Sequence, residues 1–259
     1  MAELNGAPAT PDELQTLALV NYGHFTSMRV DGQQIRGLSH HIERLVRDCR
    51  ILFAVDLDRE RVRGFIAQAI EGRAGSFVVR VTVFDPALQL GHPGAQADPH
   101  ILVTTRPAGA LPPASMRVQS TSYVRDLPEV KHVGLFGALR HRRNAQLDGF
   151  DDAVFTDPES YVSEGATWNI GFYDGEHVIW PNAEVLSGVT MRLLQQVHDR
   201  TTTAPVNVAD LPRMQAAFAT NTAIGVRAIN TINELEYPTD HPIFETLRKE
   251  YDEIPGESL

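Results

Sequence analysis

The chain has little of what marks several other protein classes. Only one cysteine, Cys49, occurs in 259 residues, so no intrachain disulfide can form and a reducing compartment is expected. No apolar run approaches the ~20 residues that a membrane-spanning helix needs. The N-terminal stretch MAELNGAPATPDEL is acidic and polar, unlike a secretory signal. These absences predict a cytoplasmic protein without a membrane partner.

Positive charge is also scarce. The formal net charge is −10, from 23 Lys and Arg against 33 Asp and Glu. Nucleic acids select a strongly basic surface, so we expect no nucleic-acid partner, although a local basic pocket would still hold a small anion. His24, His40, His41 and His132 do not form a spaced set of metal ligands. We therefore expect no metal site.

The length and composition predict two domains around a shared cleft. Hydrophobic residues make up 42% of the 259 residues, enough for more than one core. The stretch RPAGALPPAS, residues 106–115, is rich in Pro, Gly and Ala and marks a linker. We expect a small N-terminal domain over residues 1–108, with 1–14 loosely held, a linker over 109–116, and a larger C-terminal domain over 117–259.

Hydrophobic patterning predicts helices and strands mixed without a regular βαβ order, which favours an α+β fold. Apolar residues at helical spacing predict helices over residues 38–53, with Ser39 as N-cap, and over 58–72. Runs rich in β-branched residues predict strands over 76–86, 100–107, 116–124 and 152–157. Further helices are expected over 137–149 and from about Val189.

Two ionisable residues stand in settings that suit catalysis. Glu164 follows an apolar strand, between Ser163 and Gly165, where a carboxylate either caps a turn or faces a group that attracts negative charge. Lys131 follows a Pro-bounded segment in RDLPEVKHVGLF. Desolvation and nearby cations can lower the pKa of a lysine and make it a nucleophile. Most lysines, however, are simply solvated.

Two other stretches suit a phosphate group. Gly188 precedes an apolar helical pattern that begins at Val189-Thr190, and a glycine turn that leads into a helix presents free N–H groups and a positive dipole end. An ordinary helix cap is the alternative interpretation. Thr222 lies in a second turn of small residues, and Arg44 could add a charge-assisted contact, although a surface arginine is the alternative there.

The order and spacing of these stretches resemble the class IV aminotransferases, the fold-type IV group of pyridoxal-phosphate enzymes. Gly188 of the Gly-Val-Thr helix start follows Glu164 by 24 residues, and Lys131 precedes Glu164 by 33. The resemblance covers about residues 20–230. It rests on YGHFTSMRV (22–30), HIERL (41–45), Lys131, GFDDAVFTDPESYVSEGATWNIGF (149–172), LSGVTMR (186–192) and NTAIGV (221–226).

The resemblance implies a two-domain α+β fold, with a small N-terminal α/β domain and a larger C-terminal domain on a barrel-like sheet. It implies pyridoxal 5'-phosphate as cofactor and a homodimer. Lys131 would form the Schiff base and move the proton, while Glu164 would face the pyridine nitrogen. The implied cofactor-binding residues are Arg44, Lys131, Glu164, Gly188, Val189, Thr190, Thr222 and Ala223.

The sequence departs from the family pattern where many relatives carry a tyrosine five residues after the lysine. Phe136 stands there, so a hydrogen bond to the cofactor's phenolic oxygen is missing or comes from elsewhere. An arginine that faces the pocket would favour amino-acid and keto-acid substrates through a bidentate pair. Without one, a simple amine is favoured. The substrate-pocket candidates are Phe25, Arg29, Arg80, Arg125, Phe136 and Trp168.

Three functions stay open on this sequence. The first is a transaminase that moves an amino group between an amine or amino acid, D- or (R)-configured donors included, and a keto acid. The second is a pyridoxal-phosphate lyase of the aminodeoxychorismate lyase type. The third, suggested by Phe136, is a cofactor-binding protein with little catalysis.

Overall fold

The computed structural model describes residues 2–259, and its internal contacts divide the chain into two compact units. The first unit comprises the chain through Gly109 together with Val130–Gly134 and Pro255–Leu259. The second comprises Ala110–Glu129 and Leu135–Ile254. Lys131 therefore belongs to the first unit, although most residues around it in sequence belong to the second.

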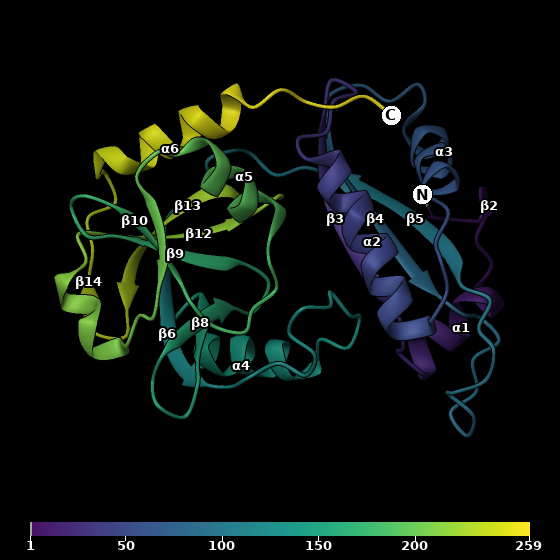
Figure 1. Cartoon of the computed structure of the whole chain (residues 1–259), viewed down its shortest axis with the longest axis horizontal. Coiled ribbons are helices and arrows are strands. Elements are labelled where there is room, and N and C mark those ends of the chain that lie inside the picture. The colour runs from purple at the N-terminus through teal and green to yellow at the C-terminus, as the bar shows by residue number, and fades with distance from the viewer. Residues whose placement is uncertain (1) are drawn as a thin grey trace. The chain divides into compact units, whose positions relative to one another are not determined.

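The first unit is built on an antiparallel sheet with strand order β2-β1-β5-β4-β3 (Figure 1). Its long strands are rich in Val, Thr and Phe, which fit a pleated surface. The strands are β1 (Ala2–Leu4), β2 (Ala7–Pro8), β3 (His24–Asp31), β4 (Ser76–Phe84) and β5 (His100–Pro107).

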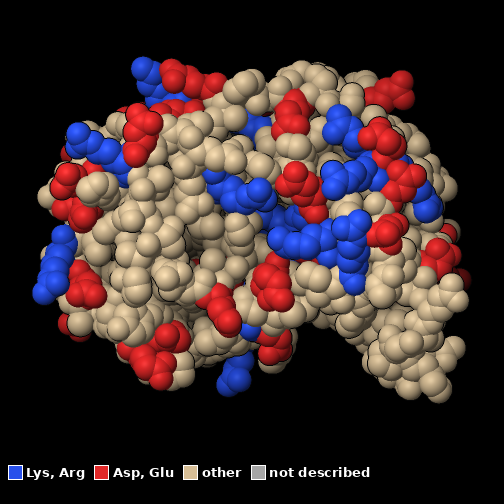
Figure 2. Space-filling view, in the orientation of Figure 1, with Lys and Arg blue, Asp and Glu red and all other residues tan. Residues whose placement is uncertain are grey.

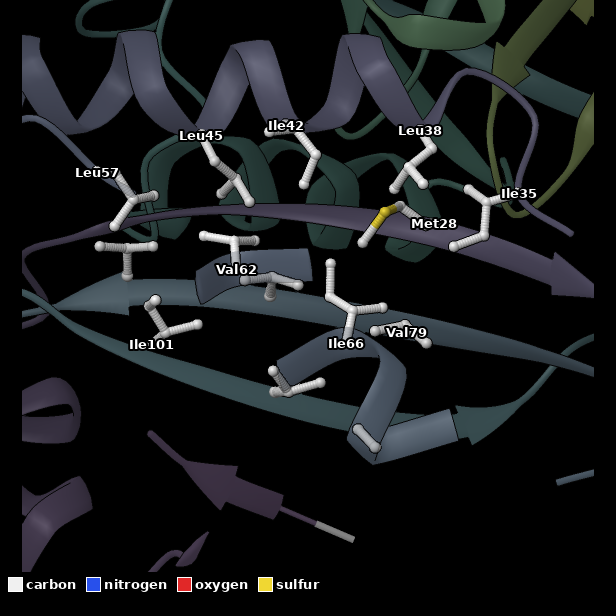
Figure 3. Packing of buried hydrophobic residues seen from close by; sticks show 14 of the residues in the cluster. Met28, Ile35, Leu38, Ile42, Leu45, Leu57, Val62, Ile66, Val79 and Ile101 are labelled. Carbon is white, nitrogen blue, oxygen red and sulfur yellow. The ribbon is translucent and has the colours of Figure 1, made fainter. Parts of the chain in front are cut away.

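Two helices, α2 (Leu38–Phe53) and α3 (Arg59–Ile70), pack on one face of this sheet. Figure 3 shows Leu38, Ile42 and Leu45 of α2 pointing at the strands, as their helical spacing predicts. The prediction that Ser39 caps α2 is wrong. Gly37 occupies the N-cap in the left-handed region, and the Ser39 N–H is bonded instead to the carboxylate of Glu257.

Residues 1–14 are predicted to be loosely held, but residues 2–14 carry regular structure, and Met1 lies outside the described residues. β1 pairs with β5, and Leu4 is buried. Helix α1 (Pro11–Leu19) starts with a capping box in which Thr10 and Glu13 satisfy each other's backbone N–H groups. Strand pairing and the capping box therefore order residues that the composition alone predicts to be loosely held.

The second unit is built on a barrel in which β6, β7, β8, β9, β12 and β13 pair in a closed ring. The pairing of Glu164 with Asn169 joins β8 to β9 and completes the ring. The strands of this unit are β6 (Met116–Ser122), β7 (Asp152–Thr156), β8 (Val162–Gly165), β9 (Asn169–Tyr173), β10 (Val178–Pro181), β11 (Thr201–Ala204), β12 (Ala216–Asn221), β13 (Gly225–Ile232) and β14 (Leu235–Glu236).

Helices cover the outside of the barrel. α4 (Phe136–Leu147) packs on β7, and α5 (Val189–Val197) and α6 (Pro242–Glu253) pack on β12 and β13. A short 3-10 helix, η1 (Val208–Arg213), lies near the barrel core. None of the helices between residues 2 and 259 has the length and apolarity to cross a membrane. Acidic and basic side chains are interspersed on the face drawn in Figure 2.

Candidate functional site

Lys131 lies at the edge of the sheet in the first unit. The segment Val130–Gly134 runs along β3, where the N–H of Phe25 donates to the carbonyl of Lys131 and the N–H of Val133 donates to the carbonyl of Gly23, both at 2.9 Å. The backbone N–H of Lys131 donates to Oδ2 of Asp48 on α2 at 3.0 Å. The lysine backbone is therefore fixed on both sides.

Two cations of the first unit share one aromatic ring. Nζ of Lys131 lies 4.9 Å from the centre of the Phe25 ring, and the guanidinium of Arg80 lies 3.6 Å from it. β3 and β4 pair in a register that sets Ser27 opposite Arg80, so Arg80 reaches Phe25 along the diagonal. Burial lowers the pKa of Arg80. The structure thus places one substrate-pocket candidate, Arg80, beside the predicted lysine.

Arg44 is buried on α2, as a phosphate ligand would be. Its neighbour His41 bonds to the Thr26 hydroxyl through Nδ1 at 2.7 Å. Burial holds the pKa of His41 well below its usual value, and the charges of Arg44 and Lys131 lower it further. His41 is therefore neutral and adds no positive charge to that of Arg44.

His24 makes the stability of the first unit depend on pH. It is fully buried, packs near Phe53, and its two ring nitrogens have no partner among residues 2–259. Burial lowers the pKa of His24 from 6.5 to about 3, with a smaller contribution from the charge of Arg47. The unfolded chain therefore takes up the proton first, so stability is lost as the pH falls below 6.5.

We expect His24→Leu to reduce this pH dependence. Between pH 7.5 and 5.5, His24 should remove about 1.4 kcal/mol from the free energy of unfolding of the parent protein, and the variant should be spared that loss. Urea unfolding at both pH values measures the difference. Equal losses in parent and variant would show that His24 is protonated in the folded state.

The carboxylate of Glu164 is held by an ion pair within the second unit. Nε of Arg125 lies 3.0 Å from Oε1 of Glu164, and each side chain is only 7% exposed. The backbone N–H of Leu186 donates to Oε2 at 3.3 Å. These two contacts, from a guanidinium and a backbone N–H, hold the Glu164 carboxylate in one orientation. Arg125, predicted as a candidate for the substrate carboxylate, thus contacts a carboxylate of the chain itself.

A row of paired residues on three neighbouring barrel strands brings Glu164 near the two predicted phosphate loops. Glu164 pairs with Asn169 on β9, and Asn169 pairs with Thr220 on β12. The side chain of Asn169 donates to the carbonyl of Leu186 at 2.8 Å. A Cβ at Gly188 would lie 2.0 Å from Oδ1 of Asn169, so only glycine lets the loop before α5 approach the barrel this closely.

The start of α5 fits a phosphate ester. Gly188 is the N-cap, and no side chain caps the first N–H groups. The hydroxyl of Thr190 is buried and has no partner among residues 2–259, and the same holds for Thr220 on the neighbouring β12. Buried polar atoms are rarely left without a partner. Open N–H groups and an orphaned hydroxyl at a helix start are the donors that a phosphate takes.

The turn between β12 and β13 is the second predicted phosphate loop at this end of the barrel. The side chain of Asn221 accepts from the N–H groups of Ala223 and Ile224 at 2.8 and 3.0 Å and donates to the carbonyl of Thr167 at 3.1 Å. These bonds shape the turn that contains Thr222 and Ala223. The hydrogen bonds of Asn221 therefore tie this turn to the β8–β9 loop, next to Glu164.

A cavity of about 430 Å³ in the second unit includes the ion pair in its wall. Tyr123 lines it beside Arg125 and Glu164, and burial, Asp126 and Glu164 raise the pKa of Tyr123, which keeps its phenol protonated. The other lining residues are Val124, Phe155, Asp157, Tyr161, Ser163, Asn182, Ala183, Glu184 and Pro205. Small molecules have room beside Glu164 within this unit alone.

The remaining substrate-pocket candidates lie in different settings. Arg29 is bound by Asp31 and by the carbonyl of Gly109. Trp168 packs in the barrel core, where its indole N–H donates to Asp152 at 2.8 Å. Phe136 begins α4 and is 78% exposed. The Trp168 ring also packs against Gly165, the residue after Glu164.

Comparison with known proteins settles which family has this arrangement. The sequence profile of the family Amino-transferase class IV matches residues 23–232. The chain belongs to the class IV aminotransferases. The match includes Arg44, Lys131, Glu164 and both predicted phosphate loops.

Solved structures of aminotransferases share the fold. Branched-chain aminotransferase from Thermoproteus uzoniensis with norvaline superposes with a TM-score of 0.85 over 97% of this chain and 93% of its own, at 18% identity. The PLP-bound form of a hypothetical aminotransferase from Mycobacterium tuberculosis gives 0.81 over 97% of each chain, at 19% identity. The predicted family and the predicted fold are both confirmed.

Among curated proteins, a probable branched-chain-amino-acid aminotransferase of Rickettsia bellii is 30% identical over 125 residues. This match covers 45% of the present chain and 43% of the relative, so the chain spans less than half the length of the curated relatives it matches.

Sequence reasoning missed several residues of the site. Asp48, which bonds the lysine backbone, and Asn169, which holds the loop before α5, received no role. The signal for Asp48 was an acid four residues after Arg44 on a helix face that otherwise turns inward. The scarcity of lysine was a second unused signal, because Lys131 and Lys249 are the only two lysines of the chain.

Proposed function

We propose that this chain is a pyridoxal-phosphate-dependent aminotransferase that moves an amino group between an amino acid and a keto acid. The observation that carries the proposal is made at one end of the barrel. Thr190 at the start of α5 and Thr220 on β12 each leave a buried hydroxyl without a described partner, and Thr220 pairs with Asn169, which in turn pairs with Glu164. Phosphate donors and a buried carboxylate at the same end of the barrel suit the two polar ends of a phosphorylated pyridine ring. Family membership supports the same activity.

When bound, pyridoxal phosphate supplies an aldehyde and a ring that accepts the electrons released at the substrate Cα. Lys131 offers the only amine of the first unit apart from the chain terminus, because the other lysine, Lys249, lies on α6. We assign Lys131 Nζ as the nucleophile and as the group that takes the proton from the substrate Cα and returns it. The carboxylate of Glu164, which pairs with Arg125, would hold a proton on the ring nitrogen.

The phosphate-binding residues follow from their donors. Arg44 would bind through its guanidinium, and Gly188, Val189 and Thr190 through the N–H groups at the start of α5 and the Thr190 hydroxyl. Thr222 and the backbone of Ala223 would contribute from the turn that Asn221 shapes. Phe25 would pack beside Lys131.

Arg80 supports amino acids rather than simple amines as substrates. Its guanidinium lies against the same phenylalanine ring as Lys131, and its only described hydrogen bond is a long one of 3.3 Å to the Thr82 hydroxyl. A guanidinium in this position suits a bidentate contact with the carboxylate of a substrate.

A half-reaction tests the activity. The yellow holoenzyme, mixed with one amino donor and no acceptor, should lose its colour and release pyridoxamine phosphate on denaturation. L- and D-amino acids and (R)- and (S)-amines are screened as donors. A parent protein that no donor converts would refute the proposal.

The variant Arg80→Leu tests substrate recognition. It should raise the KM for an amino acid by roughly 10- to 100-fold, because it removes a charged hydrogen bond, and leave the KM for a simple amine unchanged.

Two finer features complete the proposal. We propose a homodimer, supported by the exposed apolar side chains of Phe136, Leu139 and Leu147 on α4, and light scattering of the purified protein measures its mass. A cytoplasmic location stays a prediction. The lyase alternative is not favoured, because the relatives that match are aminotransferases.

A further inference from the structure

A buried carboxylate without a role in the proposed chemistry holds the backbone of Lys131. Asp48 is 0% exposed on α2 and accepts the Lys131 N–H through Oδ2 at 3.0 Å. The carbonyl of Lys131 accepts from the N–H of Phe25 at 2.9 Å. Helix α2 therefore fixes one polar group of the lysine backbone and β3 fixes the other.

The second oxygen of Asp48 does not explain why an acid is buried here. Oδ1 accepts from Nε and Nη2 of Arg47 at 2.9 and 2.6 Å, but the Arg47 side chain is 44% exposed. An ion pair with a partner in solvent stabilises little, whereas a buried carboxylate loses its hydration. The bond from the Lys131 backbone N–H is therefore the contact that accounts for an acid at this buried position.

Asp48 and Arg44 are coupled through α2. They are four residues apart, so they project from one face of the helix about one turn from each other, and both are buried. The helix is continuous over Leu38–Phe53, and its apolar face packs on the sheet (Figure 3). The same helix thus carries the proposed phosphate ligand and the acceptor that fixes the lysine.

We propose that Asp48 is a positioning residue for Lys131. By bonding the backbone N–H of the lysine to the helix that carries Arg44, it sets the distance between the amine and the phosphate-binding guanidinium. The effect of this distance on catalysis rests on the proposed function. The hydrogen bond between Asp48 and the Lys131 backbone does not depend on it. A displacement of about 1 Å in a reacting group can lower the rate by about 100-fold.

Three variants of the full-length holoenzyme test this role. Asp48→Ala removes the acceptor, Asp48→Asn keeps an oxygen in the same place, and Asp48→Glu keeps the charge but moves the acceptor by one methylene. Asp56→Ala and Asp56→Asn are matched controls, because Asp56 follows the same helix and pairs with Arg50 at an exposed site. The readouts are kcat, the Kd for pyridoxamine phosphate, which needs no bond to Lys131, and hydrogen exchange of the Lys131 amide.

We expect Asp48→Ala to lower kcat by about 100-fold while the Kd for pyridoxamine phosphate stays within about threefold of the parent and the Lys131 amide exchanges faster. Asp48→Asn should restore kcat, and Asp48→Glu should fall between the two. If Asp48→Ala does not fold, Asp48→Glu takes its place. The controls should match the parent in every readout.

Three results would overturn the inference: unchanged kcat in Asp48→Ala, an equal loss of pyridoxamine phosphate affinity, or an Asn variant as impaired as the Ala variant. If no donor reacts with the parent, the proposed function fails by itself. In that case unchanged exchange of the Lys131 amide in Asp48→Ala would still refute the positioning role, and faster exchange would support it.

Discussion

Lys131→Ala is expected to lower kcat by more than about 1,000-fold, because it removes both the nucleophile and the group that moves the proton. The variant should keep its affinity for pyridoxamine phosphate, since Arg44 and the start of α5 are untouched. Sodium borohydride followed by mass spectrometry should attach the cofactor to Lys131 in the parent and to no residue in the variant.

The test is easy to interpret because the chain has only two lysines to which the cofactor could be attached. The single other lysine, Lys249, is 77% exposed on α6 and lies 3.9 Å from Glu253. Lys249→Ala is therefore the matched control, and it should retain full activity and the labelled peptide at Lys131. A cofactor trapped on Lys249, or turnover that survives Lys131→Ala, would contradict the assignment.

Glu164→Gln is expected to lower kcat by about 100- to 1,000-fold, as the loss of one preorganised electrostatic partner does in other active sites. The amide cannot hold a proton on the ring nitrogen, whereas the phosphate donors stay in place. The change also removes the buried counter-charge of Arg125, whose side chain is 7% exposed and keeps its bond to the carbonyl of Pro128 at 2.6 Å. The free energy of unfolding should therefore fall by about 3 kcal/mol.

A double variant separates catalysis from stability. Replacing both partners with apolar residues, as in Arg125→Met with Glu164→Leu, removes the unpaired charge, and such replacements are often neutral for stability. We expect a melting temperature near that of the parent with activity as low as in Glu164→Gln. Activity that returns together with stability would show that Glu164 acts only through the fold.

The ion pair also changes how the candidates for substrate recognition are ranked. Arg80 lies on β4, and its guanidinium packs on the Phe25 ring that Lys131 also contacts. Arg125 and Arg29 are each engaged by a carboxylate of the chain, at 3.0 Å in both cases. Of the three arginines, Arg80 therefore stays our prediction for the one that binds a substrate carboxylate.

The spacing of apolar residues along the sequence predicted those helices and strands that bury one face. The helix over residues 38–53 and the strand over 100–107 agree with α2 and β5, because their apolar spacing records one buried face. Asp58, at the start of the second expected helix, is its N-cap. The glycine before α5 was likewise readable from sequence, and the structure shows why no other residue fits.

Contacts between distant residues were not readable in this way. The N-terminus of α2 is bonded by Glu257, which lies 218 residues from Ser39, and no local signal announces that partner. Val130–Gly134 joins β3 through backbone hydrogen bonds that any sequence could make. The ring of strands closes on one pair, Glu164 with Asn169, which depends on how the hairpin folds back.

The sequence by itself determined the family, the order of the chemical groups along the chain and the boundaries of the main helices and strands, because these depend on residue type and short-range spacing. Only the tertiary structure decided that Arg125 neutralises Glu164, that Arg80 shares an aromatic ring with Lys131 and that Asp48 bonds the lysine backbone. The physical reason is that a charge or a hydrogen-bond donor is matched by whatever the fold brings within about 3 Å, and that neighbour leaves no trace in the adjacent sequence.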